Sequence, residues 1–488
     1  MKLAQLFKQS SIYMVGEFVR RAIGFVMIPV YTRYLSTSDY GILELIDLFV
    51  MIAGVYFGME AIVDGMLRIY HDYADERSQA AVVSTAVIGT AGCGLLVAAV
   101  AAVTAMPLSR LAYGSASYAW LIRMSFVALF FGSLMEIGLA YQRIRERAAL
   151  FVSFSVVQIL VNVGLNIYFI AFRGMGLWGF LLSKLVVTSL GSAYLLAILF
   201  RETGFALRTD VARRIARFAG PLIISGGGIF TIHFADRFFV NHYGSLSDVG
   251  IYGLAYKFGF LVSYGVGQPF ASVWGARLYA HASGEMWKQQ FARVVTYLAF
   301  FLVLAAAGLA LFIDKILGFV APPAYLPAAM LIPIVAFGYV FREIGDYFRG
   351  ILFINKRVYL FGRITVACAA LNLALNWILI SQYKAAGAAW ATMLTWLAYM
   401  AACWIMAYSE HHIPYPVKSF LLLCSLAAAV WLASTRMKML PLGWQWAADG
   451  GLALLFVGAV WSTGYFSAEE RDTIRQQLAS TLSWRSAD

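Results

Sequence analysis

Apolar stretches of about 20 residues recur along nearly the whole chain, and each is long enough to cross roughly 30 Å of hydrocarbon. Hydrophobic residues make up 61% of the 488 residues and charged residues only 13%, whereas soluble domains carry about 25% charged residues. Lipid offers the backbone no hydrogen-bond partners, so each stretch is expected to be an α-helix. The sequence therefore predicts an all-α integral membrane protein.

We expect about fourteen transmembrane helices, with boundaries uncertain by several residues. They are expected at residues 11–33, 40–63, 81–106, 118–140, 149–172, 176–199, 218–241, 247–271, 291–313, 326–348, 358–381, 386–408, 417–435 and 446–466.

The distribution of basic residues predicts the orientation of these helices. Of the 37 Lys and Arg residues, 7 are assigned to span interiors, 7 to one side of the membrane and the remaining 23 to the other, with Arg33, Arg293, Arg363 and Lys418 near span ends counted with the adjacent loops. Basic residues concentrate on the cytoplasmic side of membrane proteins. Both termini are therefore predicted to be cytoplasmic.

A repeat divides the chain. Seven residues between Tyr34 and Leu45 recur 209 positions later between Tyr243 and Leu254, and "NVGLN" (162–166) recurs as "NLALN" (372–376), 210 positions later. Spans 1–6 and 7–12 are therefore predicted to be two parallel copies of a six-helix bundle, with a binding site between them.

The repeat and the span positions predict five segments. They are an N-terminal bundle (1–200), a basic cytoplasmic linker that forms a surface helix on anionic lipid (201–217), a C-terminal bundle (218–408), two additional transmembrane helices (409–466) and a cytoplasmic tail (467–488).

Ionisable groups inside the predicted spans need an explanation, because each is unfavourable by at least about 2.5–3.5 kcal/mol at mid-helix. Three pairs four residues apart are expected to form ion pairs: Glu17 with Arg21, Asp64 with Arg68, and Arg342 with Asp346. Others are expected to reach water from positions near an interface: Glu60, Glu136 and the group Arg342, Glu343 and Asp346.

Four cations have no carboxylate four residues away on their own helix: Arg20, Lys184, Arg237 and Lys257. Glu17 lies three residues before Arg20, but it is the acid assigned above to Arg21. Asp236 adjoins Arg237 but points about 100° round the helix, and Asp47 is the obvious acid on another helix. Spare cations outnumber spare acids, so we expect a cationic cavity between the two halves. Such a cavity favours an anionic cargo, and phosphate suits the planar fork of arginine.

Three further residues near these cations are candidates for the site: Arg21, Tyr256 and His233. Arg21 is a further candidate for the cavity, and Tyr256 is a candidate for stacking on sugar faces, although interfacial aromatic belts explain most tyrosines equally well. His233 lies one turn before Arg237 and is a candidate proton carrier, together with Asp47 and Asp236, for ion coupling. A membrane histidine is more often a hydrogen-bonded packing residue.

Glycine-rich segments interrupt two predicted spans. "GPLIISGGGIF" (220–230) opens one span and "GVGQP" (265–269) breaks the next. They are candidates for hinges, and close helix packing through small residues explains them equally well.

No phosphate-binding loop, metal-ligand cluster or nucleophile–base arrangement is found in the sequence. No segment outside the predicted spans exceeds about 25 residues, so a catalytic or nucleic-acid-binding domain has no place. We therefore expect neither an enzyme nor a cofactor.

Two segments, "RRAIGFVMIPVYTRYLSTSDYGILELIDL" (20–48) and "ADRFFVNHYGSLSDVGIYGLAYK" (235–257), resemble the paired signatures of the polysaccharide-transporter family. "KAAGAAWATM" (384–393) is similar to the usual beginning of the twelfth span in that family. The family belongs to the multidrug/oligosaccharidyl-lipid/polysaccharide exporter superfamily, and the likeness covers roughly residues 1–408.

This resemblance implies a bacterial inner-membrane flippase for undecaprenyl-pyrophosphate-linked oligosaccharides, used in O-antigen, capsule or exopolysaccharide assembly. It implies a V-shaped pair of bundles, alternating access and a driving gradient of H⁺ or Na⁺. Arg20 and Arg237 stand at the signature positions of arginines that hold the pyrophosphate, and Lys257 is a weaker candidate.

Three alternatives remain open. A multidrug antiporter of the same superfamily would favour buried acids over the basic surplus. A polysaccharide polymerase or ligase would need a large outer loop, which is absent from the predicted topology. A non-catalytic component of a polysaccharide-secretion complex, working with polymerase or secretion proteins, is compatible with the sequence.

Overall fold

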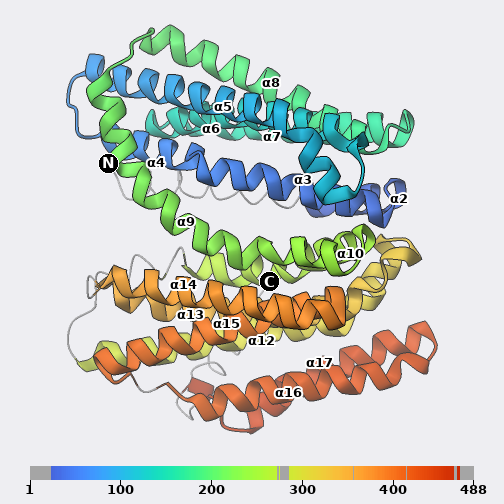
Figure 1. Cartoon of the computed structure of the whole chain (residues 1–488). Coiled ribbons are helices and arrows are strands. Elements are labelled where there is room, and N and C mark those ends of the chain that lie inside the picture. Colours follow the sequence, from blue (N-terminus) through green and yellow to red (C-terminus); the bar gives the residue numbers. More distant parts are fainter. Residues whose placement is uncertain are drawn as a thin grey trace, which may run out of the picture. The chain divides into compact units, whose positions relative to one another are not determined.

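A computed structural model of the chain describes residues 24–271, 274, 285–354, 357–413, 415–466 and 470–472. These residues are almost entirely helical, and no strand occurs among them (Figure 1). The predicted all-α class is confirmed.

The described helices are long and follow one another with short connections. In chain order they are α2 (Ile28–Tyr34), α3 (Thr37–Tyr56), α4 (Met59–Tyr70), α5 (Glu76–Tyr113), α6 (Ala119–Ile144), α7 (Ala148–Asn166), α8 (Gly176–Thr203), α9 (Thr209–Tyr243), α10 (Leu246–Gly259), α12 (Glu285–Val320), α13 (Ala328–Ile354), α14 (Val358–Leu375), α15 (Ser381–His411), α16 (Val417–Arg436) and α17 (Leu442–Ser462). Three π-helical turns are η2 (Ile167–Phe172), η3 (Ser263–Gly267) and η5 (Asn376–Ile380), and three short 3₁₀ turns are η1 (Ala116–Tyr118), η4 (Pro323–Tyr325) and η6 (Met437–Met439).

Ten helical stretches in the described residues are long and apolar enough to cross a membrane. One of them, Tyr359–Glu410, has 52 residues, enough for two crossings at about 1.5 Å per residue. Lys384 divides it, because its φ of 49° and ψ of −128° are not helical. The expected total of fourteen also counts α9, α17 and the span at 11–33, which lies mostly outside the described residues.

The described residues form two compact units. Unit 1 holds those up to Leu254 together with Gly318–Ala328 and Thr365–Thr392. Unit 2 holds Ala255–Leu317, Ala329–Ile364 and those from Met393 onward. The division into two six-helix bundles with a V-shaped arrangement stays a prediction.

The repeated signature forms the same helix cap twice in unit 1. The backbone N–H of Asp39 donates to Ser36 Oγ at 3.1 Å, and Ser36 Oγ donates to Asp39 Oδ2 at 2.8 Å, at the beginning of α3. Asp248 and Ser245 make the same two contacts, at 3.1 and 2.8 Å, at the beginning of α10. The Ser and Asp of the repeat therefore satisfy helix N-termini.

The two repeated glycines let α3 and α10 cross in direct contact. A Cβ added to Gly41 would lie 1.9 Å from the carbonyl oxygen of Leu246, and one added to Gly250 would lie 2.0 Å from that of Thr37. These contacts are reciprocal, since each position is 209 residues from its counterpart. Ser247 Oγ also lies 2.7 Å from Thr37 Oγ1.

The second repeated motif forms an asparagine pair beside a π-helical turn. Asn166 Nδ2 donates to Asn162 Oδ1 at 2.5 Å, directly before η2. Asn376 Nδ2 donates to Asn372 Oδ1 at 2.9 Å, where η5 begins. Both matches of the sequence repeat thus correspond to equal local structures.

The predicted linker is not a separate surface helix. Its first three residues end α8, residues 204–208 are not helical, and α9 begins at Thr209 and continues without interruption into the next predicted span. Its apolar side is buried: Val211 and Ile215 are 0% and 4% exposed and pack in a core cluster with residues of α4, α5 and α6. The beginning of α9 is therefore part of the core of unit 1. Contact with anionic lipid stays a prediction.

Arg214 attaches the beginning of α9 to the turn after α4. Its guanidinium donates to Asp72 at 2.5 Å and to Tyr73 Oη at 3.1 Å. Arg68 also donates to Asp72, at 2.6 Å, so the predicted pairing of Arg68 with Asp64 is wrong. The hydrogen bond from Arg68, assisted by Arg214, holds the pKa of the Asp72 carboxyl below its usual range.

The C-terminal helices α16 and α17 are joined to α12 by ion pairs in unit 2. Lys315 of α12 pairs with Asp449 of α17, and both side chains are almost completely buried. Ser434 of α16 donates to the other oxygen of Asp449 at 2.7 Å. One buried carboxylate therefore connects all three helices.

The glycine crossing predicts the effect of adding a single methyl group. Gly250→Ala is expected to destabilise the protein by about 1–3 kcal/mol, because a backbone carbonyl cannot move aside as a side chain can. Gly54→Ala is the matched control: nothing lies within 4 Å of its Cβ position in α3, and alanine is the better helix former by about 1 kcal/mol. Thermal unfolding of the purified protein measures both, and equal effects would contradict the crossing.

Candidate functional site

A buried ion cluster surrounds Arg237 of α9, in unit 1. Its side chain is 4% exposed, and Nη1 donates to Asp236 Oδ1 at 2.9 Å and to the carbonyl oxygen of His233 at 2.7 Å. Its Nε lies 3.4 Å from Oε2 of Glu44 on α3, which is 11% exposed. One guanidinium therefore bridges carboxylates from two helices.

The second oxygen of Asp236 is also satisfied. The hydroxyl of Tyr252, a fully buried residue of α10, donates to Oδ2 at 2.5 Å. Thr392 Oγ1 donates to the same oxygen at 3.3 Å. A carboxylate with no exposed surface is strongly unfavourable unless donors surround it, and here α9, α10 and α15 supply them.

Glycine at position 253 makes room for the second carboxylate. A Cβ on Gly253 would lie 2.5 Å from Cδ of Glu44. Gly253 is also the repeat counterpart of Glu44, 209 residues later. The side chain of Glu44 on α3 therefore occupies the space that the missing side chain of Gly253 leaves open on α10.

The expectation of unneutralised cations is wrong for Arg237 and Lys184. Arg237 folds back onto its neighbour Asp236, because its long side chain spans the angle between adjacent residues. Lys184 Nζ lies 3.1 Å from Asp47 Oδ1, with side chains 35% and 44% exposed. Asp47 is the interhelical acid that the sequence suggested.

The remaining predicted site residues are distributed differently. Arg20 and Arg21 lie outside the described residues. Lys257 is exposed on α10. Tyr256 is buried, with its ring edge-to-face against Tyr339 at 5.6 Å. His233 is half-buried and contributes its carbonyl oxygen to the cluster, and its predicted proton-carrying role stays a prediction.

Glu44 is the member of the cluster that sequence reasoning did not single out. Its position between the repeated Gly41 and Leu45 made it appear to be part of a signature rather than a buried charge. A signal was present, since it is an acid aligned with Gly253 in the second copy. An acid opposite a glycine in two helices that touch indicates a side chain crossing the interface.

The acids and arginines of α13 give a mixed outcome. Arg342 Nε lies 3.7 Å from Asp346 Oδ2, which confirms the predicted pair. Glu343 was expected to reach water at an interface, and this is wrong: the residue is 9% exposed and accepts a hydrogen bond from Ser263 at 2.5 Å.

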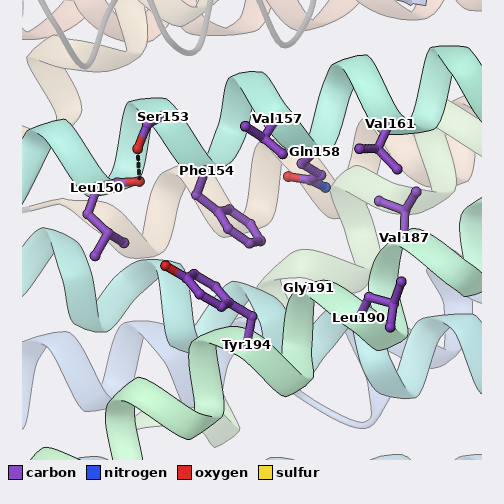
Figure 2. Close-up of a pocket in the computed structure, with 10 residues that line it drawn as sticks. All are labelled: Leu150, Ser153, Phe154, Val157, Gln158, Val161, Val187, Leu190, Gly191 and Tyr194. Atoms are coloured by element: carbon purple, nitrogen blue, oxygen red, sulfur yellow. Dashed lines mark hydrogen bonds between the residues drawn. The ribbon is translucent and has the colours of Figure 1, made fainter.

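A groove of about 350 Å³ lies between α7 and α8, away from these charges (Figure 2). The rings of Phe154 and Tyr194 stack 6.0 Å apart within it, and Gln158 and Gly191 contribute to its wall. No charged side chain lines it, so it does not suit a phosphate.

The fold of the chain is that of multi-helix membrane transporters. The lipid II flippase MurJ in an inward closed conformation matches with a TM-score of 0.77 and 13% identity, over 95% of this chain and 99% of that one. An inward-facing multidrug resistance MATE family transporter of the MOP superfamily matches with a TM-score of 0.63 and 14% identity, over 80% and 94%. At these identities the likeness shows the fold.

A family model described as polysaccharide biosynthesis protein matches residues 6–274, more than half of the chain. The chain therefore belongs to the polysaccharide biosynthesis protein family, and the resemblance drawn from the signature segments is confirmed. An "uncharacterized membrane protein" of Haemophilus influenzae is 22% identical over 271 residues, which is 53% of this chain and 61% of that protein. The chain thus covers less than two thirds of this relative.

The ion cluster predicts a large effect of removing its cation. Arg237→Ala is expected to destabilise the protein by about 3–5 kcal/mol, because it leaves buried carboxylates without their partner. Lys184→Ala removes a partly exposed pair, which is worth about 0–1 kcal/mol. Membrane abundance and thermal unfolding of both variants measure the difference. An Arg237→Ala protein as stable as the Lys184→Ala protein would contradict the structural role.

Proposed function

We propose that this protein is a flippase that moves an undecaprenyl-pyrophosphate-linked oligosaccharide across the bacterial inner membrane by alternating access. Membership in the polysaccharide biosynthesis family carries the proposal, and the transporter fold supports it. The cargo would be a repeat unit of O-antigen, capsule or exopolysaccharide. The 23-to-7 bias of basic residues supports a cytoplasmic position for both termini.

The proposed pyrophosphate contacts are Arg20 and Arg237, which stand at the signature positions, and, as weaker candidates, Arg21, Lys184 and Lys257. Lys257 is exposed on α10. Arg237 and Lys184 are engaged with carboxylates, so we propose that they contribute only in a state in which these pairs open. Tyr256 would likewise need to leave Tyr339 before it stacks on a sugar.

An ion gradient of H⁺ or Na⁺ is proposed to drive the cycle. Asp47, Asp236 and His233 are the candidates in unit 1. Of the two acids, Asp47 is more accessible to solvent: its side chain is 44% exposed, whereas that of Asp236 is 0% exposed. Protonation of Asp47 would remove the charge that holds Lys184, and would free a cation for the cargo.

Two alternatives are retained. A multidrug antiporter shares the fold, and the pairing of Arg237 and Lys184 weakens the charge argument against it. A non-catalytic component of a polysaccharide-secretion complex, working with polymerase or secretion proteins, also fits the family. Membership in the polysaccharide biosynthesis protein family favours a saccharide cargo over a drug.

The proposal predicts a defect in glycan export. Cells without this protein are expected to lose surface glycan and to accumulate the lipid-linked precursor, and the wild-type gene is expected to restore export. Vesicles containing the purified protein are expected to move lipid-linked oligosaccharide but not a cationic dye. Dye transport without glycan transport would establish the antiporter instead.

Arg20 provides the residue-level test. Arg20→Ala is expected to reduce export about tenfold or more, because hydrogen bonds to charged groups are worth roughly 1.5–3 kcal/mol and 1.4 kcal/mol corresponds to a factor of ten. Arg20→Lys keeps the charge without the planar fork and is expected to fall between. Export is compared at equal membrane abundance, and unchanged export by Arg20→Ala would remove this residue from the mechanism.

A further inference from the structure

Glu343 of α13 is a buried carboxyl group in unit 2 with an unusual environment. One oxygen, Oε1, accepts a hydrogen bond from Ser263 Oγ at 2.5 Å. The other, Oε2, lies over Gly267, where an added Cβ would be only 2.3 Å away. A serine and a glycine of one short segment therefore contact the two oxygens of this carboxyl group.

That segment is the π-helical turn η3. The backbone N–H of Gln268 bonds to the carbonyl oxygen of Ser263, five residues earlier, and this pattern defines the turn. A single π-turn within an α-helix is rare and frequently lies at a functional position. Here it brings Ser263 and Gly267 to the same carboxyl group.

Glu343 lies deep within its span. It precedes Leu352, the end of the apolar stretch that begins at Ala328, by nine residues, or about 14 Å at 1.5 Å per residue. Ser263 precedes Ala271, the end of its own stretch, by eight residues, or about 12 Å. Both distances exceed the length of a glutamate side chain, which explains why Glu343 does not reach an interface.

The neighbouring arginines form ion pairs with a different acid, Asp346. Asp346 receives Arg349 Nη1 at 3.2 Å and Arg342 Nε at 3.7 Å, and the hydroxyl of Tyr399 donates to it at 2.8 Å. Arg342 also lies over the ring of Trp396 at 5.5 Å.

Among the described residues no Lys, Arg or His nitrogen lies within 4.0 Å of the Glu343 carboxyl group. The charged groups whose fields reach it are Asp346, Arg342 and Arg349, all on α13. From the facing segments, η3 contributes the hydroxyl of Ser263, and α15 contributes Tyr399 through Asp346. Among the residues that the structure describes, an ionised Glu343 would have one hydrogen-bond donor, Ser263, for two oxygens, whereas a protonated one needs no cation.

We propose that Glu343 is a proton-binding site, protonated on Oε2 while it lies against Ser263 and Gly267, and that it releases this proton to water when η3 and α13 separate during transport. The step converts a carboxylic acid into a carboxylate and a hydrated proton, and the membrane proton gradient supplies the proton. Its place in transport rests on the proposed function, whereas proton binding itself does not.

Infrared spectroscopy of the full-length protein in lipid nanodiscs tests proton binding directly. At pH 7 the wild type is expected to show the C=O band of a protonated carboxyl group, and Glu343→Gln, which preserves size and the contact with Ser263, is expected to lose it. Asp314→Asn is the control, because Asp314 of α12 pairs with Lys438 and has no contact with Glu343, and this variant is expected to retain the band. A band equally strong in Glu343→Gln and wild type would overturn the proposal.

Ser263→Ala gives a second, smaller change. It removes only the hydroxyl group, so the pH at which the band disappears on titration is expected to shift upward, because the carboxylate loses its donor. An unshifted titration would show that Glu343 does not bind its proton next to Ser263, and would overturn the proposed proton-binding site.

Transport under an imposed pH gradient tests the coupling. Inverted vesicles are supplied with undecaprenyl-pyrophosphate-linked oligosaccharide, and the rate with the gradient is divided by the rate without it. This ratio is expected to exceed one for the wild type and Asp314→Asn and to fall to about one for Glu343→Gln. An unchanged ratio in Glu343→Gln would overturn the coupling role. A wild type that moves no glycan would contradict the proposed function, while the infrared band would still decide proton binding.

Discussion

A charge inside an apolar span has to be matched by a partner within hydrogen-bond distance, and the described interior is organised by this constraint. Arg237 lies between Asp236 and Glu44, Lys184 contacts Asp47, and Lys315 joins Asp449. Because lipid supplies no hydrogen-bond partners, each pair also links the helices that carry it. The positions of α3, α9 and α10 in unit 1, and of α12 and α17 in unit 2, follow from these contacts.

The residues of the internal repeat have structural roles, and these roles explain why they recur within this chain. Ser36 and Asp39 cap one helix as Ser245 and Asp248 cap another, and the paired asparagines accompany π-helical turns. Gly41 and Gly250 allow two backbones to touch. The signature that identifies the family is thus explained by how two equivalent helices begin and cross, without reference to the cargo.

Two buried acids, Asp236 in unit 1 and Glu343 in unit 2, are stabilised in different ways. Asp236 is surrounded by a guanidinium, a phenol and a threonine hydroxyl, so its charge is matched by fixed donors. In the described part of the chain, the contacts of the Glu343 oxygens are one hydroxyl, from Ser263, and Gly267. A carboxyl group with fixed partners holds helices together, whereas one with few partners is free to exchange a proton. The same side-chain chemistry therefore serves structure in unit 1 and, as we propose, proton exchange in unit 2.

Much of the fold was predictable from local patterns. Apolar length predicted the helices, and the offsets of 209 and 210 residues predicted equal local structures that the caps and asparagine pairs display. Charge pairs one turn apart were predictable, as for Arg342 and Asp346, although this rule failed for Arg68. Between helices, the sequence suggested the acid Asp47 but not which cation it contacts. Glu44, Lys184 and Glu343 depend on residues 80 to 193 positions away, and no periodicity within one helix carries that information.

By itself, the sequence determined that the chain is helical and multi-pass, that two short motifs recur with equal local structure, and which family the chain belongs to, because hydrophobic length and signature residues are local properties. Tertiary structure alone decided which charges are neutralised. Neutralisation depends on which helix faces which, and on where a glycine leaves space for a longer side chain to cross. The cationic surplus that the sequence suggested was therefore reduced once Arg237 and Lys184 acquired partners on other helices.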